Sequence, residues 1–385
     1  MTSLLPYVKI AFQNGALGIT EPTADGICGL VPDGAVVINA YTDNNGSAYL
    51  ITSLACVTKA GTDALTYEMI REFFEEAGEG SYLWVLNAKP TTSAAGVISL
   101  QNLSNGACRT IGVVTPITAA NLDTDVEALN EAAEGLVDDL YAPVLVVAGT
   151  PAPSTIGSAE NLTLLDSNRV AVVCGNEVTG DATIDALLDD AGAVGLLLGR
   201  IAHNAVQTSV ARVSDGAIKA RNMALGTSPI NNANAATLHG KGYITPRTWT
   251  GKAGFYWSGD ALATATTDDY GMIPRRRTID KAFRIAYKTL VEEVGAEIPV
   301  SSTGGIPNGT AKAIEAMVET AIEQGMTNQG NLGTDPDDDT DKGVIASVDP
   351  DQNVVATNKI EVSLRVKPYG YAYYIDVNLS FFTTT

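Results

Sequence analysis

Histidine and cysteine side chains are the first candidates for nucleophilic or metal chemistry, and this sequence has few of them. It contains two histidines, His203 and His239, and four cysteines that lie far apart: Cys28, Cys56, Cys108 and Cys174. No Cys-x-x-Cys pair and no Gly-x-Ser-x-Gly sequence is present, so both zinc-site spacing and a hydrolase nucleophile elbow are missing. We therefore predict no catalytic and no metal-binding residues, and we expect reduced, mostly buried cysteines.

Two loops after apolar segments are the places where a nucleotide phosphate would bind. The predicted strands VLVVAG and VAVVCG are followed by the loops TPAPSTIGS and NEVTGD. Neither loop has the pattern Gly-x-Gly-x-x-Gly, and Gly-x-x-x-x-Gly-Lys-Ser/Thr does not occur in the chain. Because the glycine-rich backbone that surrounds phosphates is absent, the sequence predicts no cofactor.

Acidic residues gather in the segment TDPDDDTDKG near residue 338. A calcium-binding EF-hand loop that began at Asp335 would need Gly at its sixth position and Glu at its twelfth. The sequence has Thr340 and Ala346 at these positions. We interpret the segment as a solvated acidic loop.

A basic stripe contrasts with the net charge of −20. Arg277, Lys281, Arg284 and Lys288 follow each other at the spacing of one helix face. Two interpretations stay open: a solvated face opposite the core, or a docking face for an acidic protein surface. The strongly negative chain repels nucleic acid and anionic lipid, so we predict no nucleic-acid partner.

The composition is typical of a globular protein that is made in the cytoplasm. With 385 residues, of which 45% are hydrophobic and 18% charged, the chain can bury the cores of two or three domains. Its first residues, MTSLLPYVKIAFQNG, lack the basic region and apolar run of a signal peptide. No segment reaches the roughly 18 apolar residues of a membrane span, so we predict no direct membrane anchoring.

The pattern of apolar residues predicts an α/β fold. A helix is expected over residues 64–77, where Leu65, Met69 and Phe73 recur at helical spacing. From residue 109 onward, apolar strands alternate with amphipathic helices such as 123–140, which indicates a largely parallel sheet with flanking helices. Two further helices are expected over residues 278–294 and 310–324.

Both ends of the chain have the alternation of a strand with one apolar face. At the N-terminus this face consists of Val8, Ile10 and Phe12; at the C-terminus it consists of Tyr373, Ile375, Val377, Leu379 and Phe381. The segment 360–366 also alternates and precedes the turn PYG, so we predict that it forms a hairpin with the C-terminal strand. Whether the terminal strands pair within their own chain or with another copy is left open.

Two segments resemble the sheath proteins of contractile phage tails, tailocins and related contractile injection systems. The first is KGYITPRTWTGKAGFYWSGDALATATTDDYGMIPRRRTIDKAFRIAYKTLVEE, and the second is KIEVSLRVKPYGYAYYIDVNLSF. The segment GLLLGRIAHNAVQTSVARVSDG resembles the passage of that family from outer to inner domain. Upstream, AYLITSLACVTKAGTDALTYEMIREFFEEAGEGSYLWVLNA is similar to a divergent branch of sheath-like proteins.

The resemblance implies a division of the chain into an arm and two domains. Residues 1–21 would form an N-terminal arm, residues 22–240 an outer α/β domain, and residues 241–385 an inner domain. The inner domain would have a mixed sheet, two helices and a C-terminal strand arm. A further division of the outer domain near residues 95–105 is left open.

The resemblance also implies a structural role without a cofactor. Subunits would form hexameric rings that stack into a helical polymer around a tail tube, linked by strand exchange through both arms. The stripe of Arg277, Lys281, Arg284 and Lys288 would face the tube, and the polymer would contact baseplate and tail terminator proteins. Assembly would take place in the cytoplasm of the bacterial host, and the product would be a virion tail or a released contractile particle.

Two other functions remain as alternatives at this point. One is an α/β enzyme or nucleotide-binding protein of unknown chemistry, carried by the region 109–205. The other is a different self-assembling shell or surface-layer protein.

Overall fold

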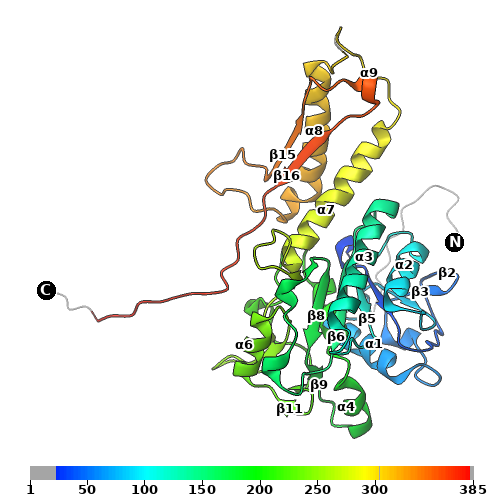
Figure 1. The fold of residues 1–385 in the computed structure, drawn as a ribbon, viewed down its shortest axis with the longest axis vertical. Helices are drawn as coiled ribbons and strands as arrows, with labels where there is room; N and C mark the ends of the chain where they lie inside the picture. Colours follow the sequence, from blue (N-terminus) through cyan, green and yellow to red (C-terminus); the bar gives the residue numbers. More distant parts are fainter. Residues whose placement is uncertain (1–22, 303, 382–385) are drawn as a thin grey trace, which may run out of the picture. The chain divides into compact units, whose positions relative to one another are not determined.

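The computed structural model describes residues 23–302 and 304–381. The chain divides into two compact units between Ile273 and Pro274, and each unit is described by itself (Figure 1). We expected the inner domain of a sheath subunit to begin at residue 241. The structure groups residues 241–273 with the first unit, and their assignment to an inner layer of a polymer stays a prediction.

The first unit is built on a seven-stranded sheet with the strand order β2-β3-β4-β1-β5-β6-β8. Neighbouring strands from β4 to β8 are parallel, whereas β2 and β3 add an antiparallel edge. The prediction of a mostly parallel α/β sheet is therefore confirmed. The strand bounds are β1 (Cys28–Val31), β2 (Asp43–Asn45), β3 (Ala48–Ile51), β4 (Leu83–Leu86), β5 (Thr110–Val113), β6 (Leu145–Thr150) and β8 (Val170–Cys174).

Helices cover both faces of this sheet (Figure 1). On one face, α1, α4 and α5 pack over Leu30 and Val147; on the other face, α2 and α3 pack over Val31 and Val146. Adjacent strand residues enter opposite cores because successive side chains of a strand point to opposite faces. The helix bounds are α1 (Ala64–Ala77), α2 (Ser93–Leu103), α3 (Leu122–Leu140), α4 (Ala182–Leu188), α5 (Val194–His203) and α6 (Asn232–Gly240).

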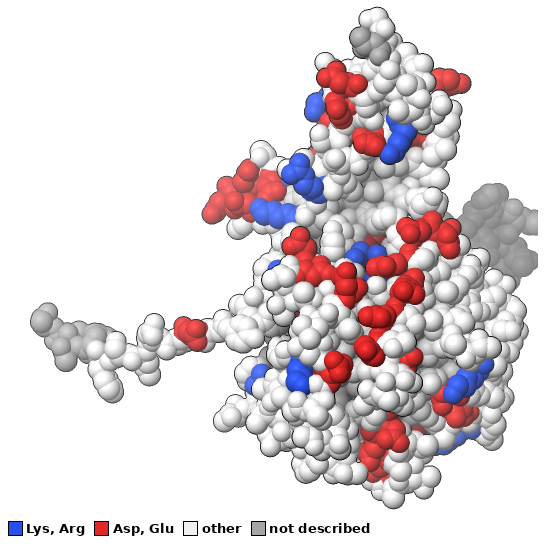
Figure 2. Space-filling view, viewed as in Figure 1, with Lys and Arg blue, Asp and Glu red and all other residues white. Residues whose placement is uncertain are grey.

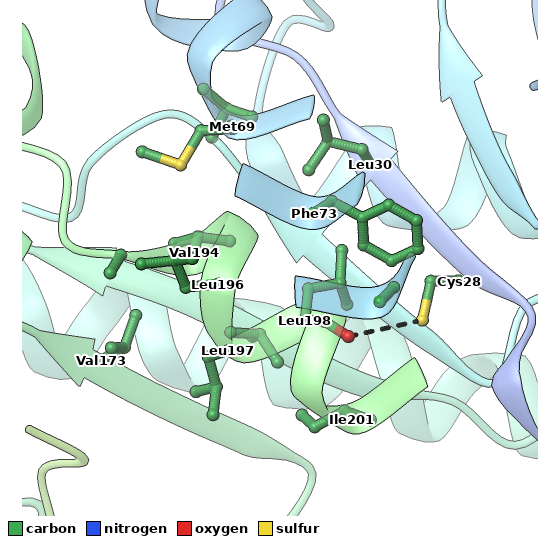
Figure 3. Close-up of a cluster of buried hydrophobic side chains, with 14 of the residues drawn as sticks. Cys28, Leu30, Met69, Phe73, Val173, Val194, Leu196, Leu197, Leu198 and Ile201 are labelled. Atoms are coloured by element: carbon green, nitrogen blue, oxygen red, sulfur yellow. Dashed lines mark hydrogen bonds between the residues drawn. The ribbon is translucent and has the colours of Figure 1, made fainter. Parts of the chain in front are cut away.

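The contact between α1 and α5 forms the centre of the first core. Figure 3 shows Met69 of α1 near Val194 of α5, and Phe73 of α1 near Leu198 of α5, next to the strand that carries Cys28. The Cys28 thiol donates to the carbonyl oxygen of Leu198 at 4.0 Å. Burial of these side chains supplies the main stabilisation of this face of the sheet.

Short antiparallel pairs attach the later part of the first unit to the sheet region. The main chain also forms a parallel bridge between Val173 and Ile244. The short strands are β7 (Asp166–Ser167) with β14 (Ala263–Thr264), β9 (Asn176–Glu177) with β10 (Met223–Leu225) and β11 (Ser228–Pro229), and β12 (Pro246–Arg247) with β13 (Tyr256–Trp257). Short 3-10 helices occur at Ala24–Gly26, Leu54–Cys56, Ile156–Ser158, Leu162–Leu164 and Val213–Asp215.

The second unit packs two helices against a two-stranded sheet. Its core joins Ala282 of α7, Val318 and Ile322 of α8, and Val344 and Ala346 of β15. The two helices predicted in this part of the chain are confirmed. Element bounds are α7 (Ile273–Leu290), η6 (Val291–Glu293), α8 (Asn308–Gly325), η7 (Thr327–Gln329), β15 (Val344–Val348), α9 (Val354–Thr357) and β16 (Val362–Val366). Of the helices that the structure describes in either unit, none is long and apolar enough to cross a membrane.

The predicted hairpin between 360–366 and the C-terminal strand is wrong. β16 pairs with β15 instead, in an antiparallel register that runs from Val344 opposite Val366 to Val348 opposite Val362. β16 pairs with β15 and not with the C-terminal segment because alternate residues of β15 are buried against α8. This packing fixes β15 as a strand with one apolar face.

Three further elements differ from the sequence-based expectation. The segment GAVVINA, residues 34–40, has the apolar sequence of a strand but forms a single bridge, between Ile38 and Val57, whereas the central strand β1 was not predicted. Residues 95–105, where a subdomain division was left open, lie largely within helix α2, and its Val97 and Leu100 are part of the core. The helix predicted to reach residue 294 ends at Leu290.

Candidate functional site: the C-terminal segment and helix α7

The C-terminal arm, residues Tyr373–Phe381, has no strand partner within the described part of the chain. Its apolar side chains are exposed, with Ile375 at 77% and Leu379 at 95% of full accessibility. Tyr373 contacts the ring of Tyr371, with 5.9 Å between the centroids. The N-terminal candidates Val8, Ile10 and Phe12 lie outside the described residues. The structure thus describes the C-terminal candidates as accessible apolar groups on an extended segment.

The arm begins just after a well-fixed point of the second unit. The N–H of Lys367 donates to the carbonyl oxygen of Gly343 at 2.8 Å, and the Lys367 carbonyl accepts from the N–H of Gly333 at 2.9 Å. The Lys367 amine contacts Asp341 at 2.7 Å and, with the N–H groups of Gly343 and Asp335, lowers the pKa of Asp341 to about 2. The acidic loop is therefore held by hydrogen bonds to this point.

In the two-stranded sheet of β15 and β16, the main-chain groups at the edge of β15 are hydrogen-bonded. Those at the edge of β16 have no partner among the described residues. The N–H groups of Ala346 and Val348 in β15 donate to Glu319 Oε1 at 2.8 Å and to Glu315 Oε1 at 2.9 Å, both on α8. Two hydrogen bonds, the larger effect from the Lys312 amine and the smaller from the Val348 N–H, hold the pKa of Glu315 below its ordinary value. The outward main-chain groups of β16 have no such partner in the described chain. An extended segment could add to β16 as a further strand.

Half of the predicted basic stripe on helix α7 is buried. Arg277 and Lys281 are buried, and the Lys281 amine donates to Gln329 Oε1 at 2.8 Å and to Asn331 Oδ1 at 2.7 Å. Arg284 is half-buried and Lys288 is exposed. The four residues are brought to one helix but not to one surface, so only Arg284 and Lys288 remain candidates for an external contact.

The sequence reasoning missed an apolar surface at the end of α7. Val294 is the last residue of the helix predicted over residues 278–294, but its side chain is 81% exposed and the observed helix ends before it. Tyr287 and Val291, at helical spacing before Val294, are also partly exposed. Gly295, with a φ of 87°, follows the predicted end at residue 294, so it gave no sign that α7 ends at Leu290.

The structure describes the surroundings of the cysteine and histidine side chains. All four cysteines are free thiols, three of them buried, as predicted. Burial raises the pKa of Cys108 and of Cys174 to about 12, so both thiols are protonated and unreactive at neutral pH. Burial, helped by the nearby charge of Arg247, lowers the pKa of His239. Within residues 23–302 and 304–381, no group of His, Cys, Asp and Glu side chains is arranged to hold a metal ion.

The exposed face of α3 concentrates negative charge on the first unit. Figure 2 shows acidic side chains in a column over this helix. The column consists of Asp123, Glu127, Glu131, Glu134 and Asp138, all exposed and spaced by three or four residues. Such a face repels polyanions.

Comparisons of the fold point to contractile sheaths. The chain is similar to a chain of the anti-feeding prophage baseplate at 15% identity, covering 99% of this chain and 100% of that one, with a TM-score of 0.65. It is similar to the contracted helical sheath of the same prophage at 18% identity, covering 99% of each chain, with a TM-score of 0.65.

A third similar structure is the contracted sheath complex of an extracellular contractile injection system, PVC. The identity is 15%, the match covers 99% of this chain and 98% of that one, and the TM-score is 0.63. The resemblance inferred from the sequence is thus confirmed at the level of the fold. No curated protein matches the sequence significantly.

Two family profiles divide the chain near the boundary between its two units. The DUF2586 N-terminal domain matches residues 5–261, and the DUF2586 C-terminal domain matches residues 269–385. Since these matches together span nearly the whole sequence, the chain belongs to the DUF2586 family.

Proposed function

We propose that this chain is the structural subunit of a contractile sheath. Its fold is that of sheath chains from contractile injection systems over nearly their full length. The observation that carries the proposal further is the C-terminal arm, whose apolar side chains are exposed, in a unit whose two-stranded sheet has an open edge at β16 among the described residues. A protein that polymerises through strand exchange needs these two features.

In the proposed assembly, the C-terminal arm of one copy adds to the open edge of β16 in a neighbouring copy. The N-terminal arm, with Val8, Ile10 and Phe12, forms a second link of the same kind. Copies form hexameric rings around a tail tube, and the rings stack into a helical polymer. At its ends the polymer contacts baseplate and tail terminator proteins.

The strength of one such link suits a polymer. Burying each apolar side chain of the arm stabilises the link by about 1.5–3 kcal/mol, and each backbone hydrogen bond adds about 0.5–1.5 kcal/mol. Ordering the arm costs roughly 1–2 kcal/mol per residue. Because these contributions nearly cancel, one link is weak, whereas many links act together.

Contraction in this proposal needs neither an active site nor a nucleotide. Copies assemble in an extended arrangement within the bacterial host cytoplasm and later rearrange while the arms keep them connected. The rearrangement drives the tube through a target envelope. The particle is either a virion tail or a released contractile device.

The experiment is to change the apolar face of the arm and to look for tubes by electron microscopy. The double variant Ile375→Asp and Val377→Asp, and a deletion of residues 379–385, should remain folded but form no tubes, since charge on this face prevents strand addition. The matched control is Asn378→Asp, which adds a charge to the polar face and should still form tubes. Tubes of normal length from the double variant would refute the role of the arm.

A further inference from the structure

Glu72 is a buried acid in the middle of α1 that the sheath proposal does not use. Its side chain has no solvent exposure, and neither carboxylate oxygen has a hydrogen-bonding side-chain or main-chain partner that meets standard geometry in the described chain. It lies against α5: a Cβ atom added to Gly195 would be 2.7 Å from the Glu72 Cβ and 2.9 Å from its Oε2. Glu72 therefore occupies the α1–α5 contact itself.

The two neighbouring acids on the same face of α1 have cationic partners. Glu68 contacts Lys59 at 3.2 Å and Arg71 at 2.6 Å. Glu76 pairs with Arg200 of α5 and accepts the N–H of Lys219 at 2.8 Å. Glu72, midway between them, has no ion pair with any residue that the structure describes.

Arg71, the cation whose charge acts on Glu72, is already shared among other carboxylates. Arg71 contacts Glu68 and Glu75 at 2.6 Å each and Glu177 of β9 at 2.5 Å. Glu72 thus faces two acids, Glu68 from α1 and Glu177 from β9, and one cation that they hold. From α5 it faces the main chain near Leu196, while Arg200 is engaged by Glu76. A negative charge on Glu72 would be an excess charge in this cluster.

Burial of an ionised carboxylate without a partner is strongly unfavourable, whereas burial of the neutral acid is tolerated. Burial, followed by the charge of Glu177, raises the pKa of Glu72 well above its ordinary value, although Arg71 and the Leu196 N–H act in the opposite direction. In the unfolded chain the side chain ionises near pH 4.5. Folding therefore favours the protonated form of Glu72 relative to the unfolded chain.

We propose that Glu72 is a proton-binding site within the α1–α5 contact, occupied in the folded chain at neutral pH, and that loss of its proton loosens the contact. The stabilisation is fully present below the unfolded-state pKa of about 4.5 and is lost as the pH rises through the folded-state pKa. The device is independent of the sheath proposal, because it concerns the folding of one chain.

The test compares the wild-type chain with Glu72→Gln in urea unfolding experiments from pH 5 to pH 9. Glutamine keeps the shape of the neutral acid but cannot ionise. The folding equilibrium constant of the wild type, relative to that of Glu72→Gln, should fall about tenfold per pH unit until the folded-state pKa is reached. The matched control is Glu127→Gln on the exposed face of α3, whose ratio to the wild type should not change with pH in this range. Parallel curves for the wild type and Glu72→Gln would overturn the proposal.

A second measurement tests the protonation of Glu72 in the wild-type chain, so it does not depend on whether Glu72→Gln folds. Infrared spectra of the wild-type chain at pH 7 should contain the carbonyl band of a protonated carboxylic acid, which ionised carboxylates lack. Amide hydrogen exchange should then show lower protection in α1 and α5 at alkaline pH than at neutral pH, after correction for the intrinsic rate. Absence of the infrared band at pH 7 would show that Glu72 is ionised and would overturn the proposal.

Discussion

Two glycines of α5 allow this helix to approach α1 closely. A Cβ atom added to Gly195 would be 2.3 Å from the carbonyl oxygen of Met69, and one added to Gly199 would be 2.7 Å from that of Phe73. Both obstacles are main-chain atoms of α1, so they cannot rotate away as a side chain can. The helices would have to separate to accept even a methyl group.

Gly199→Ala is therefore expected to destabilise the chain, by about 1–3 kcal/mol from overpacking. The control is Gly135→Ala in α3, where an added Cβ meets no atom within 4 Å. That substitution should stabilise the helix by about 0.5–1 kcal/mol, because glycine is a poor helix former. Urea unfolding followed by circular dichroism would measure the unfolding free energy of each variant relative to the wild type. If both substitutions changed it in the same direction, close packing at Gly199 would not explain the result.

At the scale of elements, strong helical periodicity was a reliable guide. Helix α1 was predicted at its observed bounds because Leu65, Met69 and Phe73 form one stripe and Gly78, with a φ of 96°, ends it. The central strand β1 was missed because it is only four residues long and includes Gly29, whose lack of a side chain admits Leu100. Alternation also indicated that β16 is a strand, but it could not specify its partner, since β15 and the C-terminal arm have the same pattern.

The acidic face of α3 gives a prediction for the helix as an element. Asp138 lies near the C-terminus of α3, where the helix dipole disfavours negative charge, and Asp123 lies near the N-terminus, where it is favoured. Asp138→Lys should therefore stabilise the first unit by about 0.3–1 kcal/mol, and Asp123→Lys should destabilise it by a similar amount.

Both substitutions remove the same negative charge from a chain of net charge −20, so each serves as the control for the other. Unfolding free energies at low and high salt would separate them, since the difference should shrink as salt screens the charges. Equal stabilisation by both variants would mean that relief of the overall charge, and not the helix dipole, dominates.

At the scale of the whole molecule, local patterns did not say which surfaces the fold leaves exposed. Alternation predicted a strand at the C-terminus and left its partner open, and the structure describes an exposed extended segment there without a strand partner among the described residues. The burial of Lys281 was not predictable, because its amine binds Gln329 and Asn331, which are far away in the sequence. Spacing places four cations on one helix face but does not say which part of that face the rest of the unit covers.

The proposed tube contact can accordingly be narrowed to Arg284 and Lys288. The double variant Arg284→Glu and Lys288→Glu should reduce co-sedimentation of the chain with assembled tail tubes while leaving its self-assembly unchanged. Attraction between charges at a protein surface is screened by salt, so raising the ionic strength should also weaken the wild-type association. Lys252→Glu, which makes the same kind of change at an exposed site in the first unit, should have no effect. If the double variant associates with tubes as the wild type does, the two residues form a solvated face and the tube must be held elsewhere.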